Sequence, residues 1–279
     1  MKGIIRTGMR LDKLLADMGL GTRSDIKKNI RKGKAAVNGS IVKDPGMPVT
    51  ESMDIRYFDR PVYHEEYSYY MLNKPAGYIS ATKDENSGQM TVIDLLDEEQ
   101  KRTDLFPAGR LDKDTEGLLL ITNDGQLAHR LLSPKRHVDK VYYACVFGEV
   151  TRTDIERFRN GITVTEDFTC LPADLRILNV KKYDNNADLT DLTIKTGSDS
   201  TVKIDISGFR PENAPLYVSE VEIVIREGKF HQIKRMFHAV GKEVLYLKRL
   251  SMGPLMLDPS LRPGKYRRLT EKELADLNK

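Results

Sequence analysis

The chain has 279 residues, of which 39% are hydrophobic and 31% are charged, and its net charge is +4. This composition is typical of a globular protein with one large domain or two domains. No apolar run approaches the roughly 18 residues that a membrane span needs. Residues 1–10 also lack the apolar core of a signal peptide, so we expect a cytoplasmic protein that does not contact a membrane.

The sequence lacks the patterns of the common cofactor sites. It has no Cys/His cluster with zinc spacing, no GxxxxGK[ST] loop and no GxGxxG loop. Both cysteines, Cys145 and Cys170, lie among apolar or β-branched residues, so we expect buried free thiols and no disulfide. We therefore expect chemistry from side chains alone, without a metal or a cofactor.

The positive charge is concentrated at the N-terminal end. Residues 1–60 contain 13 Lys and Arg against 7 Asp and Glu, a net charge of +6, so the remaining residues carry −2. A small basic domain ahead of a larger, nearly neutral one indicates a module that binds a polyanion.

Two helices and a hairpin are predicted within this basic region. Apolar residues at the spacing of one helix face predict the first helix: Leu11, Leu14, Leu15 and Met18. Gly19 and Gly21 end it. Ile26 and Ile30 would face inward from a second helix that begins near Thr22. An Asn-Gly turn at residues 38–39 between short apolar runs predicts a β-hairpin.

The second helix carries a row of cations, namely Arg23, Lys27, Lys28, Arg31 and Lys32. A solvated helix surface is one interpretation, although few acids interleave with these residues. The string MRLDKLLADMGLGTRSDIKKNIRKGKAAVNG (9–39) resembles an S4 RNA-binding domain. The resemblance implies an RNA partner, contacted mostly through its phosphates and its A-form shape.

Acids are concentrated in the segment GRLDKDTEGLLLITNDG (109–125). Its apolar residues 118–121, bounded by Gly and by Asn-Asp-Gly, predict a short core strand. The loop that leads into this strand is therefore held at one end, which would position its acids.

Three interpretations of this loop compete. A calcium loop requires a bidentate Glu at its twelfth place, but Asn123 stands there and leucines fill the places where the loop should turn outward. A solvated charged turn is the second interpretation. The third is a catalytic carboxylate, Asp112, kept ionised by neighbouring Arg110. Residue types alone leave the last two open.

Further strands are predicted at residues 69–72, 141–146 and 221–225. A helix follows, because four apolar residues share one face: Ile233, Met236, Phe237 and Val240. A neighbouring face carries His231, Lys234, Arg235 and His238. This row could bind phosphate, pair with an acid or be solvated surface. The mixture of strands with occasional helices predicts an α+β fold.

Four segments together resemble the RsuA-like branch of the pseudouridine synthases, which modify ribosomal RNA. They are YYMLNKPAGY (69–78), PAGRLDKDTEGLLLITNDG (107–125), DKVYYACV (139–146) and REGKFHQIKRMF (226–237). The resemblance implies an α+β architecture in which a small S4-type domain precedes a larger synthase domain with a mixed, mostly antiparallel sheet. We place these domains at residues 1–59 and 68–279, with a linker at 60–67.

The resemblance also implies roles for individual residues. Asp112 matches the catalytic aspartate, Tyr142 the tyrosine that stacks on the target base, and Lys234 the basic residue that pairs with the aspartate. Ile233 matches the apolar residue of the uracil pocket. The remaining matches are Arg110 and Thr115 in the loop, Lys140 beside the tyrosine, a structural motif at 74–77, and RNA or phosphate contacts at His231 and Arg235.

Residues 181–214 are longer than the family pattern suggests. Residues 192–195 and 202–206 alternate like strands around a polar turn at 197–200. We therefore expect an inserted hairpin and loop, with a nearly balanced charge of 5 basic against 6 acidic residues.

The implied reaction is the isomerisation of uridine to pseudouridine, which needs neither redox chemistry nor net hydrolysis and hence no cofactor. The wording of residues 231–255 is most similar to the enzyme that acts on 16S ribosomal RNA, so we expect ribosomal RNA or a precursor ribosomal subunit as partner of a monomeric enzyme. The alternatives are a 23S enzyme, a non-catalytic RNA-binding protein of ribosome assembly, and an RNA glycosylase.

Overall fold

The computed structural model describes residues 8–50, 52–62, 66–84, 87–98, 100–133, 136–166, 168–183, 192–195, 201–204 and 216–279. The chain divides into two compact units. The first comprises Met1–Tyr69, Ala81–Pro107 and Ile121–Asp124, and the second comprises Tyr70–Ser80, Ala108–Leu120 and Gly125–Lys279.

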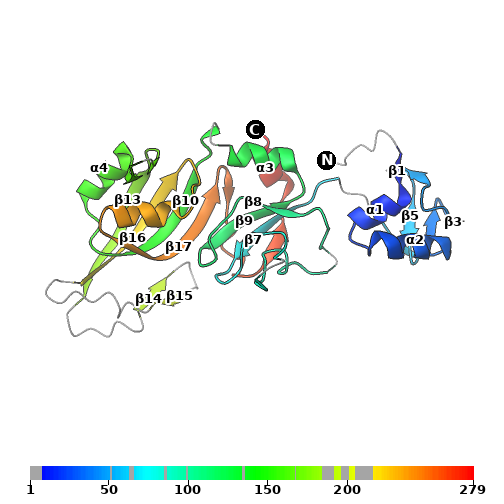
Figure 1. Ribbon diagram of the computed structural model, residues 1–279, viewed down its shortest axis with the longest axis horizontal. Helices are drawn as coiled ribbons and strands as arrows, with labels where there is room; N and C mark the ends of the chain where they lie inside the picture. Colours follow the sequence, from blue (N-terminus) through cyan, green and yellow to red (C-terminus); the bar gives the residue numbers. More distant parts are fainter. Residues whose placement is uncertain are drawn as a thin grey trace. The chain divides into compact units, whose positions relative to one another are not determined.

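The N-terminal part of the first unit contains the two predicted helices and the predicted hairpin (Figure 1). Its helices are α1 (Leu11–Asp17) and α2 (Arg23–Arg31). A four-stranded sheet has the order β3-β2-β5-β6, and β1 pairs with β4. The strands are β1 (Met9–Arg10), β2 (Ala35–Val37), β3 (Ser40–Val42), β4 (Pro48–Val49), β5 (Ile55–Tyr57) and β6 (Arg60–Pro61).

Local chemistry explains these elements. The Thr22 hydroxyl accepts a hydrogen bond from the Asp25 amide, which caps α2. Asn38 and Gly39 both have positive φ, 50° and 78°, as the tight turn between β2 and β3 requires. Leu11, Ile26 and Ile30 are fully buried in a common core. The helix faces predicted from apolar spacing are therefore confirmed.

The compact units do not follow the expected domain boundaries. Arg60–Pro61 falls in the expected linker, yet this strand pairs with β5. Segments 81–107 and 121–124 belong to the first unit. Asn123 explains part of this grouping, because its side chain accepts a hydrogen bond from the Ser68 amide and donates to Asp104. Of the expected linker, residues 63–65 lie outside the described part of the chain.

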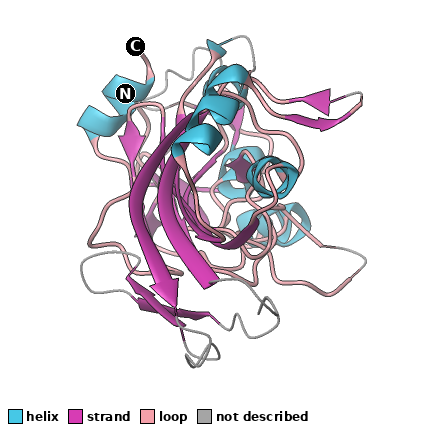
Figure 2. Ribbon diagram, turned by 90° about the vertical axis from the view of Figure 1, so that its left-hand side faces the viewer, coloured by secondary structure: helices cyan, strands magenta, loops and turns pink. Residues whose placement is uncertain are grey.

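The second domain is built on a nine-stranded sheet with the order β13-β16-β10-β17-β9-β7-β19, in which β18 also pairs with β17 and β8 with β9. Its strands are β7 (Tyr69–Lys74), β8 (Phe106–Ala108), β9 (Glu116–Thr122), β10 (Lys140–Phe147), β13 (Asp174–Tyr183), β16 (Leu216–Ile225), β17 (Glu243–Met252), β18 (Leu255–Met256) and β19 (Tyr266–Arg268). Figure 2 shows the long strands side by side and strongly curved. The pair β17–β9 is parallel, whereas β10–β16, β10–β17, β13–β16 and β7–β19 are antiparallel. The predicted mixed, mostly antiparallel sheet is confirmed.

The helices of this domain are α3 (Gly125–Leu132), α4 (Arg152–Asn160), α5 (Gln232–Ala239) and α6 (Glu271–Leu277), and a small hairpin joins β11 (Thr163–Thr165) to β12 (Phe168–Thr169). The ring centroids of Phe158 in α4 and Phe237 in α5 lie 4.9 Å apart, so these two helices contact each other through their aromatic side chains. Phe237 and Met236 are fully buried, as the apolar spacing predicts.

The strands predicted at 69–72, 118–121, 141–146 and 221–225 all lie in this sheet. Residues 118–121 are fully buried, which confirms the core strand next to the acidic loop. Cys145 and Cys170 are buried free thiols, also as predicted. Burial raises the pKa of Cys145 to about 12 and that of Cys170 to about 11, so neither thiol is a nucleophile at neutral pH.

Within the expected insert at 181–214, β14 (Leu192–Lys195) and β15 (Thr201–Ile204) form an antiparallel pair. The turn expected at 197–200 and residues 205–214 lie outside the described part of the chain. No helix among the described residues is long and apolar enough to cross a membrane.

Candidate active site

The acidic loop at residues 109–115 joins β8 to β9. A buried lysine, Lys74, fixes this loop through hydrogen bonds. Lys74, at the end of β7, is fully buried, and its ammonium group donates to the carbonyl oxygens of Pro75, Lys113 and Thr115 at 3.0, 3.1 and 2.8 Å. Burial lowers the Lys74 pKa to about 8, although nearby carboxylates oppose the shift. Lys74 thus joins the end of β7 to both sides of Asp114.

A pocket opens above this loop. Its walls come from the loop, from Tyr142 in β10, from Ile225 at the end of β16, from Leu247 in β17 and from the start of α5. Its volume is about 60 Å³, well below the roughly 300–1,000 Å³ of sites that enclose a drug-sized ligand or cofactor. The pocket is therefore a small one.

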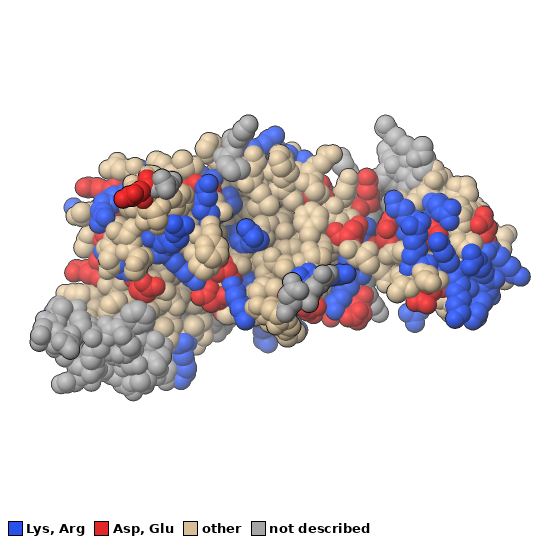
Figure 3. Space-filling view, in the orientation of Figure 1, with Lys and Arg blue, Asp and Glu red and all other residues tan. Residues whose placement is uncertain are grey.

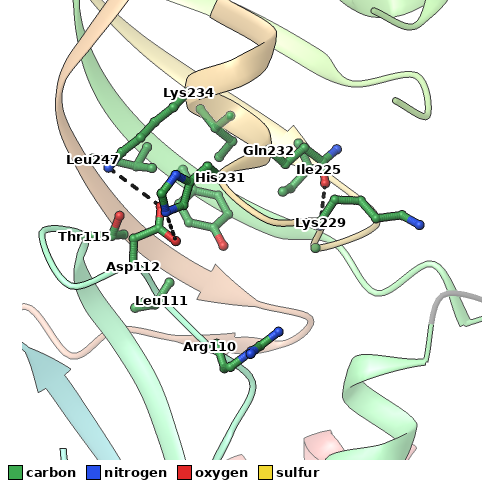
Figure 4. Close-up of a pocket in the computed structure, with 13 residues that line it drawn as sticks. Arg110, Leu111, Asp112, Thr115, Ile225, Lys229, His231, Gln232, Lys234 and Leu247 are labelled. Carbon is green, nitrogen blue, oxygen red and sulfur yellow. Dashed lines mark hydrogen bonds and ion pairs between the residues drawn. The ribbon is translucent and has the colours of Figure 1, made fainter. Parts of the chain in front are cut away.

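The chemistry-bearing groups of the pocket come from two segments far apart in the sequence, the loop at 109–115 and the start of α5 (Figure 4). Asp112 Oδ2 lies 3.7 Å from Lys234 Nζ, and Asp112 Oδ1 lies 3.6 Å from His231 Nε2. The Asp112 side chain is 25% exposed, so its charge is partly shielded from water. The resemblance implies that Lys234 pairs with Asp112. In the structure the two side chains lie close together, although the residues are 122 positions apart in the sequence.

The shorter contacts of Lys234 are with a different acid. Its ammonium group donates to both carboxylate oxygens of Asp114 at 2.7 Å. Burial works against the charge of Asp114, but the hydrogen bonds from Lys234, the charge of Lys234 and a backbone hydrogen bond together outweigh it, so the Asp114 pKa lies below its usual value. The Asp114 side chain is 70% exposed, and the sequence did not predict its contact with Lys234.

Glu116 also has a partner that its sequence did not reveal. Its carboxylate accepts a hydrogen bond of 2.8 Å from the Tyr246 hydroxyl. It begins β9 and is half-buried. Glu116 therefore fastens β9 to β17 beside the pocket and is not a free solvated acid.

Arg110 does not support Asp112 as predicted. Figure 4 shows its guanidinium group pointing away from the Asp112 carboxylate, although Arg110 lines the same pocket. In the part of the chain that the structure describes, the basic side chains within 4 Å of Asp112 are those of His231 and Lys234. Arg110 is exposed at the mouth, where it remains a candidate for contacting the substrate.

The start of α5 places three side chains on the pocket. His231 is the N-cap residue and has a left-handed backbone, φ 50°, which is uncommon for a residue other than glycine. Ile233 is buried and lines the apolar wall, as predicted. Gln232 is buried too, and its side-chain amide donates to Glu227, which fixes the turn from β16 into α5.

One buried polar group on the pocket has no partner in the described structure. The Thr115 side chain is 2% exposed, and its hydroxyl makes no hydrogen bond. Buried hydroxyls are nearly always hydrogen-bonded, so this group is an exception among the described residues. The described residues contain no group of three His, Cys, Asp or Glu that could hold a metal.

Comparisons with known proteins identify the family of the chain. The family model described as RNA pseudouridylate synthase matches residues 68–239, and the model described as S4 domain matches residues 9–55. The chain belongs to the RNA pseudouridine synthase family. This confirms the family, the fold and the enzyme class that the sequence motifs predict.

The synthase is similar over its whole length to several relatives. It is 44% identical to an uncharacterised RNA pseudouridine synthase of Bacillus subtilis, over 97% of this chain and 98% of the relative. It is 34% identical to the ribosomal small subunit pseudouridine synthase A of Escherichia coli, over 96% of this chain and all of the relative. A crystal structure of a pseudouridylate synthase covers 96% of this chain, with 33% identity and a TM-score of 0.58.

The S4 domain of the synthase carries its cations in two groups. Arg23 and Lys27 face the fully buried carboxylate of Asp12, at 3.7 and 3.8 Å. Arg10 donates two hydrogen bonds to Asp12, and these chiefly lower the pKa of this carboxyl. Lys28, Arg31 and Lys32 are exposed. Figure 3 shows Lys and Arg side chains gathered over this domain. The exposed group is thus the freer of the two for RNA phosphates.

Two residues in or beside the site were not singled out as site residues from the sequence. Sequence reasoning treated Lys74 as part of a structural motif and did not foresee that its ammonium group is buried, because lysine is almost never fully buried. It did not single out Phe230, which precedes His231 and is 74% exposed. The string Lys229-Phe230-His231 carried a signal, because an aromatic residue beside a cation is common in nucleic-acid sites.

Replacing Lys234 by Met should lower kcat by about 10- to 100-fold, with little change in KM, because an ammonium group 3.7 Å from Asp112 is lost. Lys234→Arg should retain most of the activity. Single-turnover rates of tritium release from RNA labelled at uracil C5 would measure this effect. A kcat of Lys234→Met equal to that of the wild type would remove Lys234 from the reaction.

Proposed function

We propose that the synthase isomerises a uridine of small-subunit (16S) ribosomal RNA to pseudouridine, with Asp112 as the catalytic carboxylate, and that it acts as a monomer in the cytoplasm. One observation carries the proposal. The Asp112 carboxylate projects into a small pocket whose walls include Tyr142 and Ile233, and Lys234 stands beside it. These are the side chains that a pseudouridine synthase needs around uracil.

The choice of substrate rests on relatives. The Escherichia coli protein that is 34% identical over its full length is named for the small ribosomal subunit. The S4 domain adds an exposed basic surface, which suits a structured RNA. A large-subunit (23S) RNA is the alternative substrate, since the catalytic residues would be the same.

The reaction breaks the N1–C1′ bond of uridine, turns the uracil ring and forms a C5–C1′ bond. N1 gains a proton and C5 loses one, so the product has the composition of the substrate. Asp112 would attack or electrostatically support C1′, or act as a base at C2′. In each case Asp112 acts beside the Lys234 ammonium group, which lies 3.7 Å from its Oδ2.

The target base must leave its stack in the folded RNA before it enters the pocket, at a cost of a few kcal/mol. Tyr142 is 7% exposed and lines the pocket, so its ring is positioned to cover uracil. Stacking of a base on an aromatic side chain offsets about 1–3 kcal/mol of that cost. Ile225 and Leu247 complete an apolar lining around the ring.

The test uses precursor small-subunit particles and large-subunit RNA, each labelled with tritium at uracil C5. The proposal predicts tritium release and one mapped pseudouridine in the small-subunit RNA, without chain cleavage or free uracil. Release from large-subunit RNA alone would move the substrate to 23S. Free uracil would identify a glycosylase, and binding without any release would identify a non-catalytic assembly protein.

The S4 surface leads to a prediction about salt. Lys28→Ala combined with Arg31→Ala should lower the slope of log affinity against log salt by about 1.5, because each lost phosphate contact removes about 0.7–0.9. Filter binding of small-subunit RNA at several salt concentrations measures the slope. Arg176→Ala is the control, since Arg176 is also exposed, at 67%, but lies outside the S4 domain, where it pairs with Glu222. An unchanged slope in the double variant would place the RNA elsewhere.

A further inference from the structure

Phe230 is the most exposed of the large hydrophobic side chains in the described part of the chain, at 74%. Single exposed apolar residues are common on protein surfaces, so exposure by itself carries no function. The position of Phe230 is what distinguishes it. It lies between Lys229 and His231, both of which line the active-site pocket.

One face of the Phe230 ring is already covered. The ring stacks on the His231 imidazole, with centroids 3.8 Å apart and planes 17° apart. His231 in turn reaches Asp112, 3.6 Å from Nε2 to Oδ1. The His231 side chain therefore lies between the Phe230 ring and the Asp112 carboxylate and contacts both. Most of the surface of the Phe230 ring faces solvent.

The surroundings of this stack are cationic and aromatic. The Lys229 ammonium group lies 5.9 Å from the Phe168 ring, and the Arg235 guanidinium lies 4.9 Å from the same ring. Lys229 is exposed and Arg235 is half-buried. An open aromatic face beside cations is how proteins hold a nucleic-acid strand, with bases stacked on rings and phosphates beside positive charges.

We propose that Phe230 is a positioning residue that stacks on a nucleobase next to the target uridine. This inference rests on the proposed function in so far as it needs an RNA substrate. When the target base leaves the helical stack, its neighbour loses a stacking partner. A phenyl ring at the mouth of the pocket replaces that partner and keeps the RNA in register with Asp112.

The absence of tryptophan from the chain permits a direct test. Phe230→Trp creates a single tryptophan, whose emission should fall by at least about half when small- or large-subunit RNA stacks on it. Met256→Trp is the matched control, because Met256 is 70% exposed in β18, and its emission should change by no more than about a tenth.

Activity gives the second measurement. Phe230→Ala should lower kcat/KM for tritium release by about tenfold, as expected for the loss of one stacked base. Phe230→Trp and Phe230→Tyr should restore it, which a purely structural role for this exposed side chain would not produce. Met256→Ala should keep the wild-type value.

The outcomes separate this inference from the proposed function. Quenching in Phe230→Trp without pseudouridine formation would support the stacking contact and contradict the proposed reaction. Pseudouridine formation with no quenching and a fully active Phe230→Ala would overturn the stacking contact alone. Emission that responds to ribosomal proteins but not to RNA would also overturn it, since the ring would then serve a protein partner.

Discussion

Asp112→Asn should lower turnover by at least about 10³-fold, because it removes the charge of the one carboxylate that, among the described residues, lines the pocket. RNA affinity should stay within a few-fold of the wild type, since the amide has the same shape. The fold should be retained as well, because the Asp112 side chain is 25% exposed and not part of the core. Tritium release under single-turnover conditions, together with filter binding, measures both quantities.

Asp114→Asn provides the matched control for this change. It removes the same charge two positions away, on a side chain that is 70% exposed. Because Asp114 acts through Lys234, we expect a loss of less than about tenfold. Equal and large losses in both variants would mean that the loop uses its acids jointly. An active Asp112→Asn enzyme would assign the chemistry to another residue.

Lys74→Met should destabilise the synthase by about 2–4 kcal/mol and lower its activity by about 100-fold. Three carbonyl oxygens lose their partner, while the cost of burying an ammonium group is relieved. The loop that carries Asp112 would loosen, and a displacement of about 1 Å suffices for a loss of that size. Denaturant unfolding and tritium release measure the two effects. Lys113→Met, a change of an exposed lysine in the same loop, should cost less than about 0.5 kcal/mol.

The lowered pKa of Lys74 adds a dependence on pH. Below pH 8 both the folded and the unfolded chain hold the proton of Lys74. Between about 8 and 10.5 the unfolded chain binds it and the folded chain has lost it, so the free energy of unfolding rises with pH. The stability of the wild type relative to Lys74→Met should therefore increase from pH 8 to 10. A difference that does not change with pH would show that Lys74 is not buried as a charged group.

The elements that the sequence predicted correctly are those whose burial follows a simple period. The apolar face of α5 and the run at 118–121 were visible because their side chains meet the core on a fixed spacing. Helix α4 was missed, since its 9 residues contain only two large apolar side chains. Its capping box, formed by Thr151 and Asp154, was the available signal.

The site residues that belong to sequence motifs could be predicted. Contacts between residues far apart in the sequence could not be predicted. Asp112, Tyr142, Ile233 and Lys234 were assigned by resemblance, and the structure places all four on one pocket. The contact between Asp114 and Lys234 was not predicted, because no local pattern links two residues 120 positions apart. Arg110 was expected beside Asp112 from adjacency in the chain, yet residues two apart in a loop can point in different directions, as these do.

The most direct measurement of the central claim counts pseudouridines in ribosomal RNA from cells that lack the gene. Mass spectrometry of 16S RNA should show one pseudouridine missing. The wild-type gene should restore it, and the Asp112→Asn gene, expressed to the same level, should not. A 16S RNA unchanged by the deletion would contradict the substrate, and restoration by Asp112→Asn would contradict the site.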